Sequence, residues 1–136
     1  MVQKDIKQPL QETPRLAQKV LAPFKALQEW LKGYFAGQRV PYQGPLDVEG
    51  ATVFQKQVWL TTRMIRYGER RSYGWVARAI GHPAASRAVG QALASNPICI
   101  VIPCHRVVAS NSTLCGFRGG LALKASLLAL EMGKLR

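Results

Sequence analysis

The sequence is poor in acidic residues and cysteines, and it has no long apolar run. Seven Asp and Glu stand against 19 Lys and Arg, so the 136-residue chain carries a net charge of +12. Three cysteines are too few for a disulfide scaffold and fit a reducing compartment. No apolar run is long enough to cross a membrane, and no secretory signal is visible. We therefore expect a cytoplasmic protein, or a nuclear one in a eukaryote, with no membrane partner.

The few acids are also unevenly placed. Only Glu69 and Glu131 lie beyond residue 50, where Arg and Lys are abundant. A basic surface of this kind can simply be well solvated. The excess of Arg over Lys in this half instead favours a polyanionic partner, because guanidinium groups bind phosphates and stack on bases.

Two regions are expected, with residues 1–50 as a reduced N-terminal helix and linker and residues 51–136 as the main domain. Apolar residues at helical spacing predict a helix from Arg15 to about Gly37. Pro23 either kinks that helix or starts a second one. Proline and glycine between residues 38 and 50 predict a surface linker.

Four helices are expected in the main domain. Thr52 and Gln55 form a capping-box pattern for the first helix, and Ser72 is a cap for the second. The second and third helices, joined by a turn at Gly81, have the pattern of a helix-turn-helix. The expected ranges are Val53–Tyr67, Tyr73–Ile80, Ala84–Ala94 and Leu121–Met132.

A short stretch around Cys104 carries the strongest chemical signal. The apolar run Ile98–Ile102 lies between two prolines and predicts a short buried extended segment. Cys104 follows, with His105 and Arg106 directly after it. Imidazole and guanidinium neighbours favour a thiolate, so Cys104 is a candidate nucleophile. Cys99, inside the apolar run, fits better as a small buried apolar residue.

These motifs resemble the O6-alkylguanine-DNA alkyltransferases, also called methylated-DNA–protein-cysteine methyltransferases. The similarity runs from about Phe54 to Gly133, and Ile-Pro-Cys-His-Arg-Val at 102–107 is its most specific string. Upstream the match is poor, and the N-terminal domain is reduced. The other matching segments are Gly68–Tyr73, Arg87–Gly90, Asn96–Pro97, Gly116–Leu121 and Leu127–Glu131.

The resemblance implies an α+β fold that is mainly α, with a winged-helix-like helix-turn-helix domain and a short β segment. It implies DNA repair by direct reversal: an alkyl group moves from O6 of guanine in double-stranded DNA to a cysteine, once per molecule. The damaged base is flipped out of the duplex to reach that cysteine. No cofactor and no metal are implied, and a monomer is expected.

The resemblance also assigns roles to individual residues. Cys104 is the nucleophile, His105 acts through a water, Glu131 orients the imidazole, and Tyr73 assists the leaving base and binds phosphate. The residues implied to contact DNA are Arg87, which fills the gap left in the base stack, Tyr73, Ala88, Gly90 and Arg106. Those implied to line the base pocket are Asn96, Val107, Phe117, Arg118 and Gly119.

Three other interpretations use the same residues. A non-catalytic helix-turn-helix relative would flag alkylated bases without reacting, but such relatives lack the nucleophilic cysteine. A zinc site could use Cys99, Cys104, His105 and Cys115, although no Cys-x-x-Cys pair is present. A thiol hydrolase would need only the Cys-His pair, and no other spacing supports it.

Overall fold

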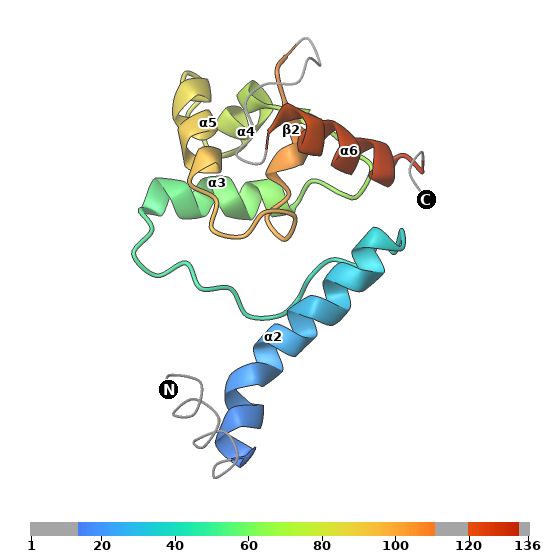
Figure 1. Cartoon of the computed structure of the whole chain (residues 1–136). Coiled ribbons are helices and arrows are strands. Elements are labelled where there is room, and N and C mark those ends of the chain that lie inside the picture. The colour runs from blue at the N-terminus through green and yellow to red at the C-terminus, as the bar shows by residue number, and fades with distance from the viewer. Residues whose placement is uncertain (1–13, 111–119, 134–136) are drawn as a thin grey trace. The chain divides into compact units, whose positions relative to one another are not determined.

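The computed structural model describes residues 14–110 and 120–133, and residues 14–23 only as helical backbone (Figure 1). The chain divides into two units, Met1–Leu46 and Asp47–Arg136. Within the described residues, regular structure is mainly helical with one short sheet, which confirms the predicted fold class. No described helix has the length and apolar character needed to cross a membrane.

The first unit contains α2 (Pro14–Phe35), which continues through Pro23, so this proline does not begin a second helix. The linker folds back on α2 through aromatic contacts. The Trp30 ring lies against Tyr34 and Tyr42, with centroids 5.6 and 5.7 Å away, and its Nε1 donates to the Val40 carbonyl at 2.7 Å. These contacts hold the segment after α2 against the helix, which its proline and glycine content did not predict.

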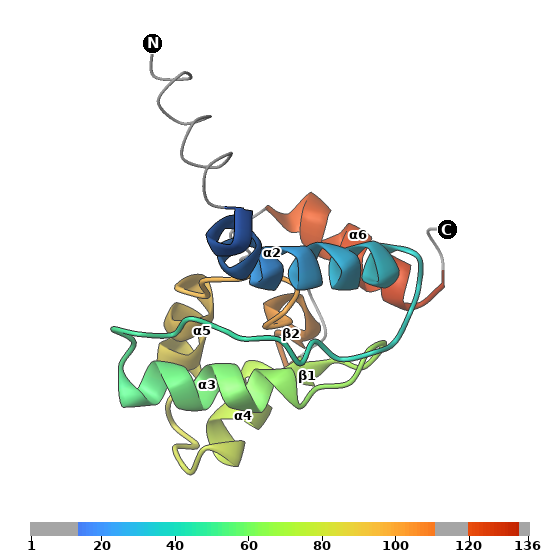
Figure 2. The ribbon, with the colours of Figure 1, turned by 90° about the horizontal axis from the view of Figure 1, so that it is seen from below.

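In the second unit, α3 (Val53–Arg63), α4 (Tyr73–Ala79) and α5 (Ser86–Ala94) pack against one another. A short 3-10 helix, η1 (Cys104–Arg106), leads into β2 (Val107–Val108), and α6 (Leu121–Glu131) packs on η1. Figure 2 shows β1 (Arg71–Ser72) beside β2. The two strands are parallel, with Arg71 opposite Val107 and Ser72 opposite Val108.

Local sequence signals account for where the helices begin. Thr52 Oγ1 accepts from the Gln55 amide at 3.1 Å, while Gln55 Oε1 accepts from the Thr52 amide at 2.9 Å. This capping box was predicted, and so was the Ser72 cap, which accepts from the Trp75 amide at 2.9 Å. Each cap satisfies amides that the first helical turn leaves without partners.

The predicted end of the first of these helices is wrong. The helix stops at Arg63 instead of Tyr67. The residues that follow bond to distant parts of the chain: the Ile65 carbonyl accepts from Arg106 at 2.7 Å, and the Gly68 amide donates to Glu131 at 3.0 Å. These contacts replace the hydrogen bonds that further helical turns would have made.

The predicted extended segment Ile98–Ile102 is also wrong, because the chain forms a tight turn there. The Ile102 amide donates to the Ile98 carbonyl at 3.1 Å, and Ile100 has φ +75. A β-branched residue rarely adopts this left-handed conformation. The Asn96 side chain closes the turn from inside, accepting from the Ile98 amide at 2.9 Å and donating to the Ile102 carbonyl at 2.8 Å.

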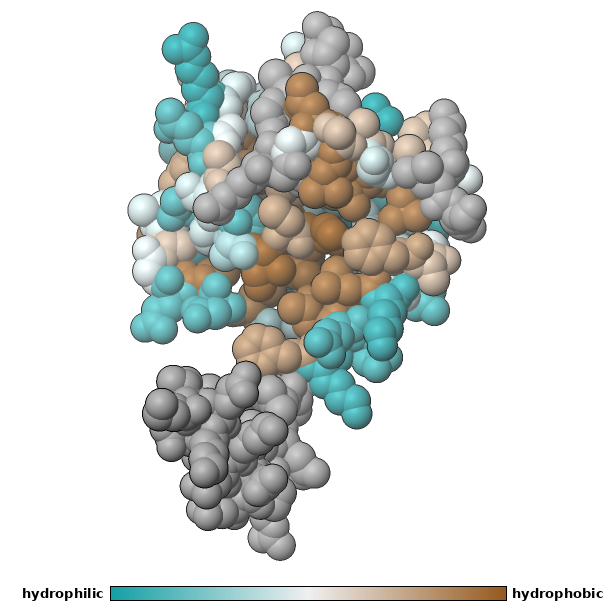
Figure 3. All heavy atoms as spheres, viewed as in Figure 1, coloured by the Kyte–Doolittle hydropathy of each residue, from teal (hydrophilic) through white to brown (hydrophobic). Residues whose placement is uncertain are grey.

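The core of the second unit lies between its helices and β2. Val58, Val76, Val89 and Val107 are fully buried, and Trp59 Nε1 donates to the Ala92 carbonyl at 2.8 Å, which ties α3 to α5. Figure 3 shows apolar atoms gathered across one face of this unit, with hydrophilic side chains on either side. The packed core therefore holds η1 and the end of α6 in place.

Candidate functional site

Cys104 is the first residue of η1 and only 7% exposed. Its amide donates to the Ile102 carbonyl at 2.7 Å, and its carbonyl accepts from the Val107 amide. Burial raises the pKa of the thiol to about 11, although hydrogen bonding to Asn96 acts in the opposite direction. The sequence prediction of a favoured thiolate considered only the neighbours in sequence; in the folded chain, loss of solvent outweighs the hydrogen bond to Asn96 and the charge of Lys124.

His105 is completely buried and lies against Glu131, with 2.5 Å between Nε2 and Oε2. Burial lowers the pKa of His105, while its contact with Glu131 acts to raise it. The net direction keeps the imidazole neutral near pH 7, and a neutral imidazole can accept a proton. The structure thus brings together Glu131 and the residue next to Cys104, two positions 26 residues apart in the sequence.

Glu131 ends α6 and is 1% exposed. Besides His105, its carboxylate accepts from the Gly68 amide at 3.0 Å and from Arg106. Nε of Arg106 lies 2.8 and 3.1 Å from the two carboxylate oxygens, and Nη2 lies 3.0 Å from Oε2. A carboxylate at a helix C-terminus is unfavourable by itself. These donors explain how it is accommodated.

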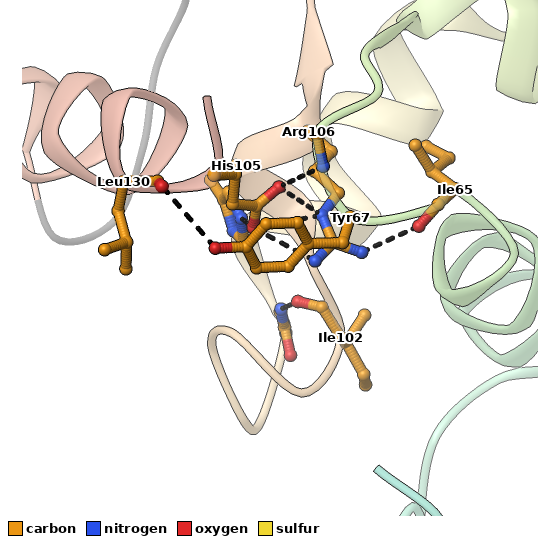
Figure 4. A network of polar contacts seen from close by, with 9 residues as sticks. Ile65, Tyr67, Ile102, His105, Arg106 and Leu130 are labelled. Carbon is orange, nitrogen blue, oxygen red and sulfur yellow. Dashed lines mark hydrogen bonds and ion pairs between the residues drawn. The ribbon is translucent and has the colours of Figure 1, made fainter. Parts of the chain in front are cut away.

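Arg106, which was predicted to contact DNA, is held inside the protein by buried partners. The residue is 8% exposed, and its guanidinium bonds to Glu131 and, as Figure 4 shows, to the Ile65 carbonyl. The Tyr67 ring lies 5.8 Å from the guanidinium carbon. With its donors directed to these two partners, Arg106 holds the Glu131 carboxylate in place.

Lys124 is a member of the site that sequence analysis did not identify. It is fully buried in α6, and its Nζ donates to the Val107 carbonyl at 2.8 Å. The same Nζ lies 5.9 Å from the ring centroid of Tyr73. A signal was present, because Lys124 stands three and four residues before the apolar Leu127 and Leu128, on the side of the helix that they bury.

Tyr73 and the helix-turn-helix residues lie on neighbouring elements. Tyr73 begins α4 and is half-buried, and a Cβ added at Gly90 would come 3.8 Å from its ring. On α5, Arg87 is exposed, and Ala88 is half-buried. Gly90 of α5 therefore lies close to the Tyr73 ring, while Arg87 is exposed to solvent.

The other predicted pocket residues divide into two groups. Asn96 and Val107 are buried beside Cys104. The Asn96 side chain donates to the Ile102 carbonyl, and the Val107 carbonyl accepts from Lys124. Phe117, Arg118 and Gly119 lie outside the described residues. So does Cys115 of the alternative zinc site, and among the residues that are described, no three His, Cys, Asp or Glu side chains form a group able to hold a metal.

Comparisons with known proteins identify similar sequences and folds. Residues 53–133 match the family model described as 6-O-methylguanine DNA methyltransferase, DNA binding domain. A methylated-DNA–protein-cysteine methyltransferase of Mycolicibacterium paratuberculosis is 49% identical over 108 residues, which are 79% of this chain and 65% of that protein. The chain thus spans about two thirds of the length of this curated relative.

Solved structures are similar as well. The crystal structure of Mycobacterium tuberculosis OGT in complex with DNA has a TM-score of 0.78 and 45% identity, covering 82% of this chain and 68% of that one. S. pombe Atl1, solved in complex with damaged DNA containing O6-carboxymethylguanine, has a TM-score of 0.53 and 33% identity. That match covers 58% of this chain and 75% of Atl1.

Proposed function

The chain belongs to the 6-O-methylguanine DNA methyltransferase family, and from this premise we propose that it repairs DNA by moving an alkyl group from O6 of guanine to Cys104. The observation that carries the proposal is the buried arrangement of Cys104, His105 and Glu131. Nucleophile, base and orienting carboxylate form an arrangement that activates a weak side-chain nucleophile on several unrelated folds.

The transfer is a displacement at the alkyl carbon. A bond forms from Cys104 Sγ to that carbon, the bond from carbon to O6 breaks, and the electron pair stays on the base. The hydrogen lost by the thiol balances the one that the released guanine gains. Because burial raises the pKa of Cys104 to about 11, this proton has to be removed during the reaction. Neutral His105, oriented by Glu131, is the base that the site offers, directly or through a water.

Base flipping follows from the burial of the thiol. A guanine inside a duplex cannot reach a sulfur that is 7% exposed, so the damaged nucleotide has to leave the stack. We propose that α5 binds the DNA and that exposed Arg87 occupies the gap, where its planar guanidinium can stack. Half-buried Tyr73, at the start of α4, is proposed to contact the phosphate and the leaving base.

The two regions are proposed to differ in role. All described residues of the candidate site lie in Asp47–Arg136, so we assign DNA binding and transfer to residues 51–136 and a scaffold role to residues 1–50. Deleting residues 1–14 should leave the transfer rate unchanged. Loss of transfer in a shortened chain that still folds would contradict this assignment.

The decisive experiment counts transferred groups. The thioether formed at Cys104 has no good leaving group, so each molecule should react once. With excess duplex DNA carrying radiolabelled O6-methylguanine, label should reach a plateau near one methyl per chain and map to Cys104 by mass spectrometry. Cys104→Ser should bind the same DNA without accepting label, because a hydroxyl is a weaker nucleophile. Binding without transfer by the unmodified chain, or release of product beyond the plateau, would refute the proposal.

A further inference from the structure

Lys124 is a fully buried lysine that the proposed reaction does not yet use. Burying an ammonium group costs free energy unless the surroundings compensate for it. Here the Val107 carbonyl accepts from Nζ at 2.8 Å, and the Tyr73 ring centroid lies 5.9 Å away. Val107 is in turn bonded to Cys104 through its amide, so the position of this cation calls for a chemical explanation.

The formal charges of the buried side chains show that the Lys124 cation can balance one negative charge. Among the described residues, the buried side chains that carry charge are Arg106 and Lys124 on the positive side and Glu131 on the negative side. Arg106 bonds to both carboxylate oxygens of Glu131, so these two charges offset each other. His105 is held neutral. The buried charges therefore sum to +1 while Cys104 is a thiol, and to zero when it becomes a thiolate.

A short chain of hydrogen bonds fixes the ammonium group relative to the nucleophile. Lys124 Nζ donates to the Val107 carbonyl, and the Val107 amide donates to the carbonyl of Cys104. Lys124 itself comes from α6, whose end also supplies Glu131. A charge held in this way requires no rearrangement when negative charge develops on sulfur, which is the condition for effective electrostatic stabilisation.

We propose that Lys124 is a positioning residue for the transfer: its buried cation, held by the Val107 carbonyl, stabilises the negative charge that develops on Cys104 Sγ. The purpose of this device rests on the proposed function, but its effect on the thiol can be measured without any DNA. Consistent with the geometry, Lys124 acts to lower the pKa of Cys104 and also that of His105.

The test measures how fast Cys104 reacts with iodoacetamide, a small uncharged reagent, between pH 7 and pH 10. Lys124→Met removes the charge and keeps the length, and Lys124→Arg keeps the charge. Lys56→Met, at an exposed position of α3, is the matched control. Modification is quantified at Cys104 by mass spectrometry, because other cysteines also react.

Lys124→Met should slow the reaction about tenfold or more at each pH below the thiol pKa, because each unit added to that pKa lowers the thiolate fraction tenfold. Lys124→Arg should recover part of the rate, and Lys56→Met should match the unmodified chain. A loss of packing alone would expose Cys104 and speed its modification, so the direction of the change separates the two explanations. An unchanged or increased rate in Lys124→Met would overturn the proposal.

A second measurement does not depend on the Met variant folding. In the unmodified chain, NMR of the lysine side chains should show Lys124 as a charged, slowly exchanging ammonium at pH 7.5, assigned by its loss in the charge-conserving Lys124→Arg variant. A neutral amine at this pH would overturn the proposal. Because neither measurement uses alkylated DNA, a failure of methyl transfer would count against the proposed function and not against the role of Lys124.

Discussion

Replacing Glu131 by Gln should destabilise the protein strongly, although the two side chains have nearly the same shape. The carboxylate is 1% exposed and accepts from the Arg106 guanidinium, the Gly68 amide and His105. Gln keeps one acceptor oxygen but removes the charge, which leaves the buried guanidinium without a counter-ion. Breaking a buried ion pair from one side costs about 3–5 kcal/mol. In a domain of this size we expect the melting temperature to fall by more than about 10 °C.

The matched control is Glu69→Gln. Glu69 also pairs with an arginine, Arg71, but at 3.6 Å and with side chains that are 37% and 40% exposed. A solvent-exposed pair contributes about 0–1 kcal/mol. Urea unfolding of both variants at two salt concentrations tests the difference. The loss of unfolding free energy in Glu69→Gln should be smaller at high salt. The loss in Glu131→Gln should persist at both salt concentrations, because buried charges are poorly screened.

A double variant tests the cause of the loss. If the isolated guanidinium is responsible, Arg106→Met combined with Glu131→Gln should be more stable than the sum of the two single losses predicts. Strict additivity would refute the argument. So would a Glu131→Gln variant that loses no more stability than Glu69→Gln.

Three further outcomes are expected. Burial lowers the pKa of His105 in the folded protein, so the free energy of unfolding should decrease as the pH falls below about 6.5, where the unfolded chain binds the proton more readily. The free energy of unfolding of His105→Gln should depend less on pH between pH 6.5 and 5. With the pKa of Cys104 raised to about 11, its modification by iodoacetamide should accelerate about tenfold per pH unit up to pH 10, and a plateau near pH 8.5 would contradict this. Arg87→Ala should slow transfer from duplex DNA more than from free O6-methylguanine, and equal losses would exclude a stacking role.

Several features could be predicted from sequence because their causes lie within a few residues. The capping box of Thr52 and Gln55 joins positions three apart, and so does the Ser72 cap on the Trp75 amide. The turn at Gly81 also marked the break between α4 and α5. The same local pattern singled out Cys104, since the residues beside it carry its chemical signature.

Other features were decided by partners far along the chain. Arg106 was expected to contact DNA, but Glu131, 25 residues later, and Ile65, 41 residues earlier, take up its guanidinium. The helix from Val53 ends early because the Ile65 carbonyl serves the same guanidinium. No local pattern reports contacts across such distances.

The sequence by itself determined the family, the capped helix starts and the candidate nucleophile, because each depends on residue types at short spacing. Only the tertiary structure decided the state of that nucleophile. Burial takes Cys104 out of water and raises the pKa of its thiol, although its neighbours in sequence are His105 and Arg106. Packing of α6 brings Lys124 and Glu131 to the site, and the distribution of charge around the thiol depends on that packing rather than on the order of residues.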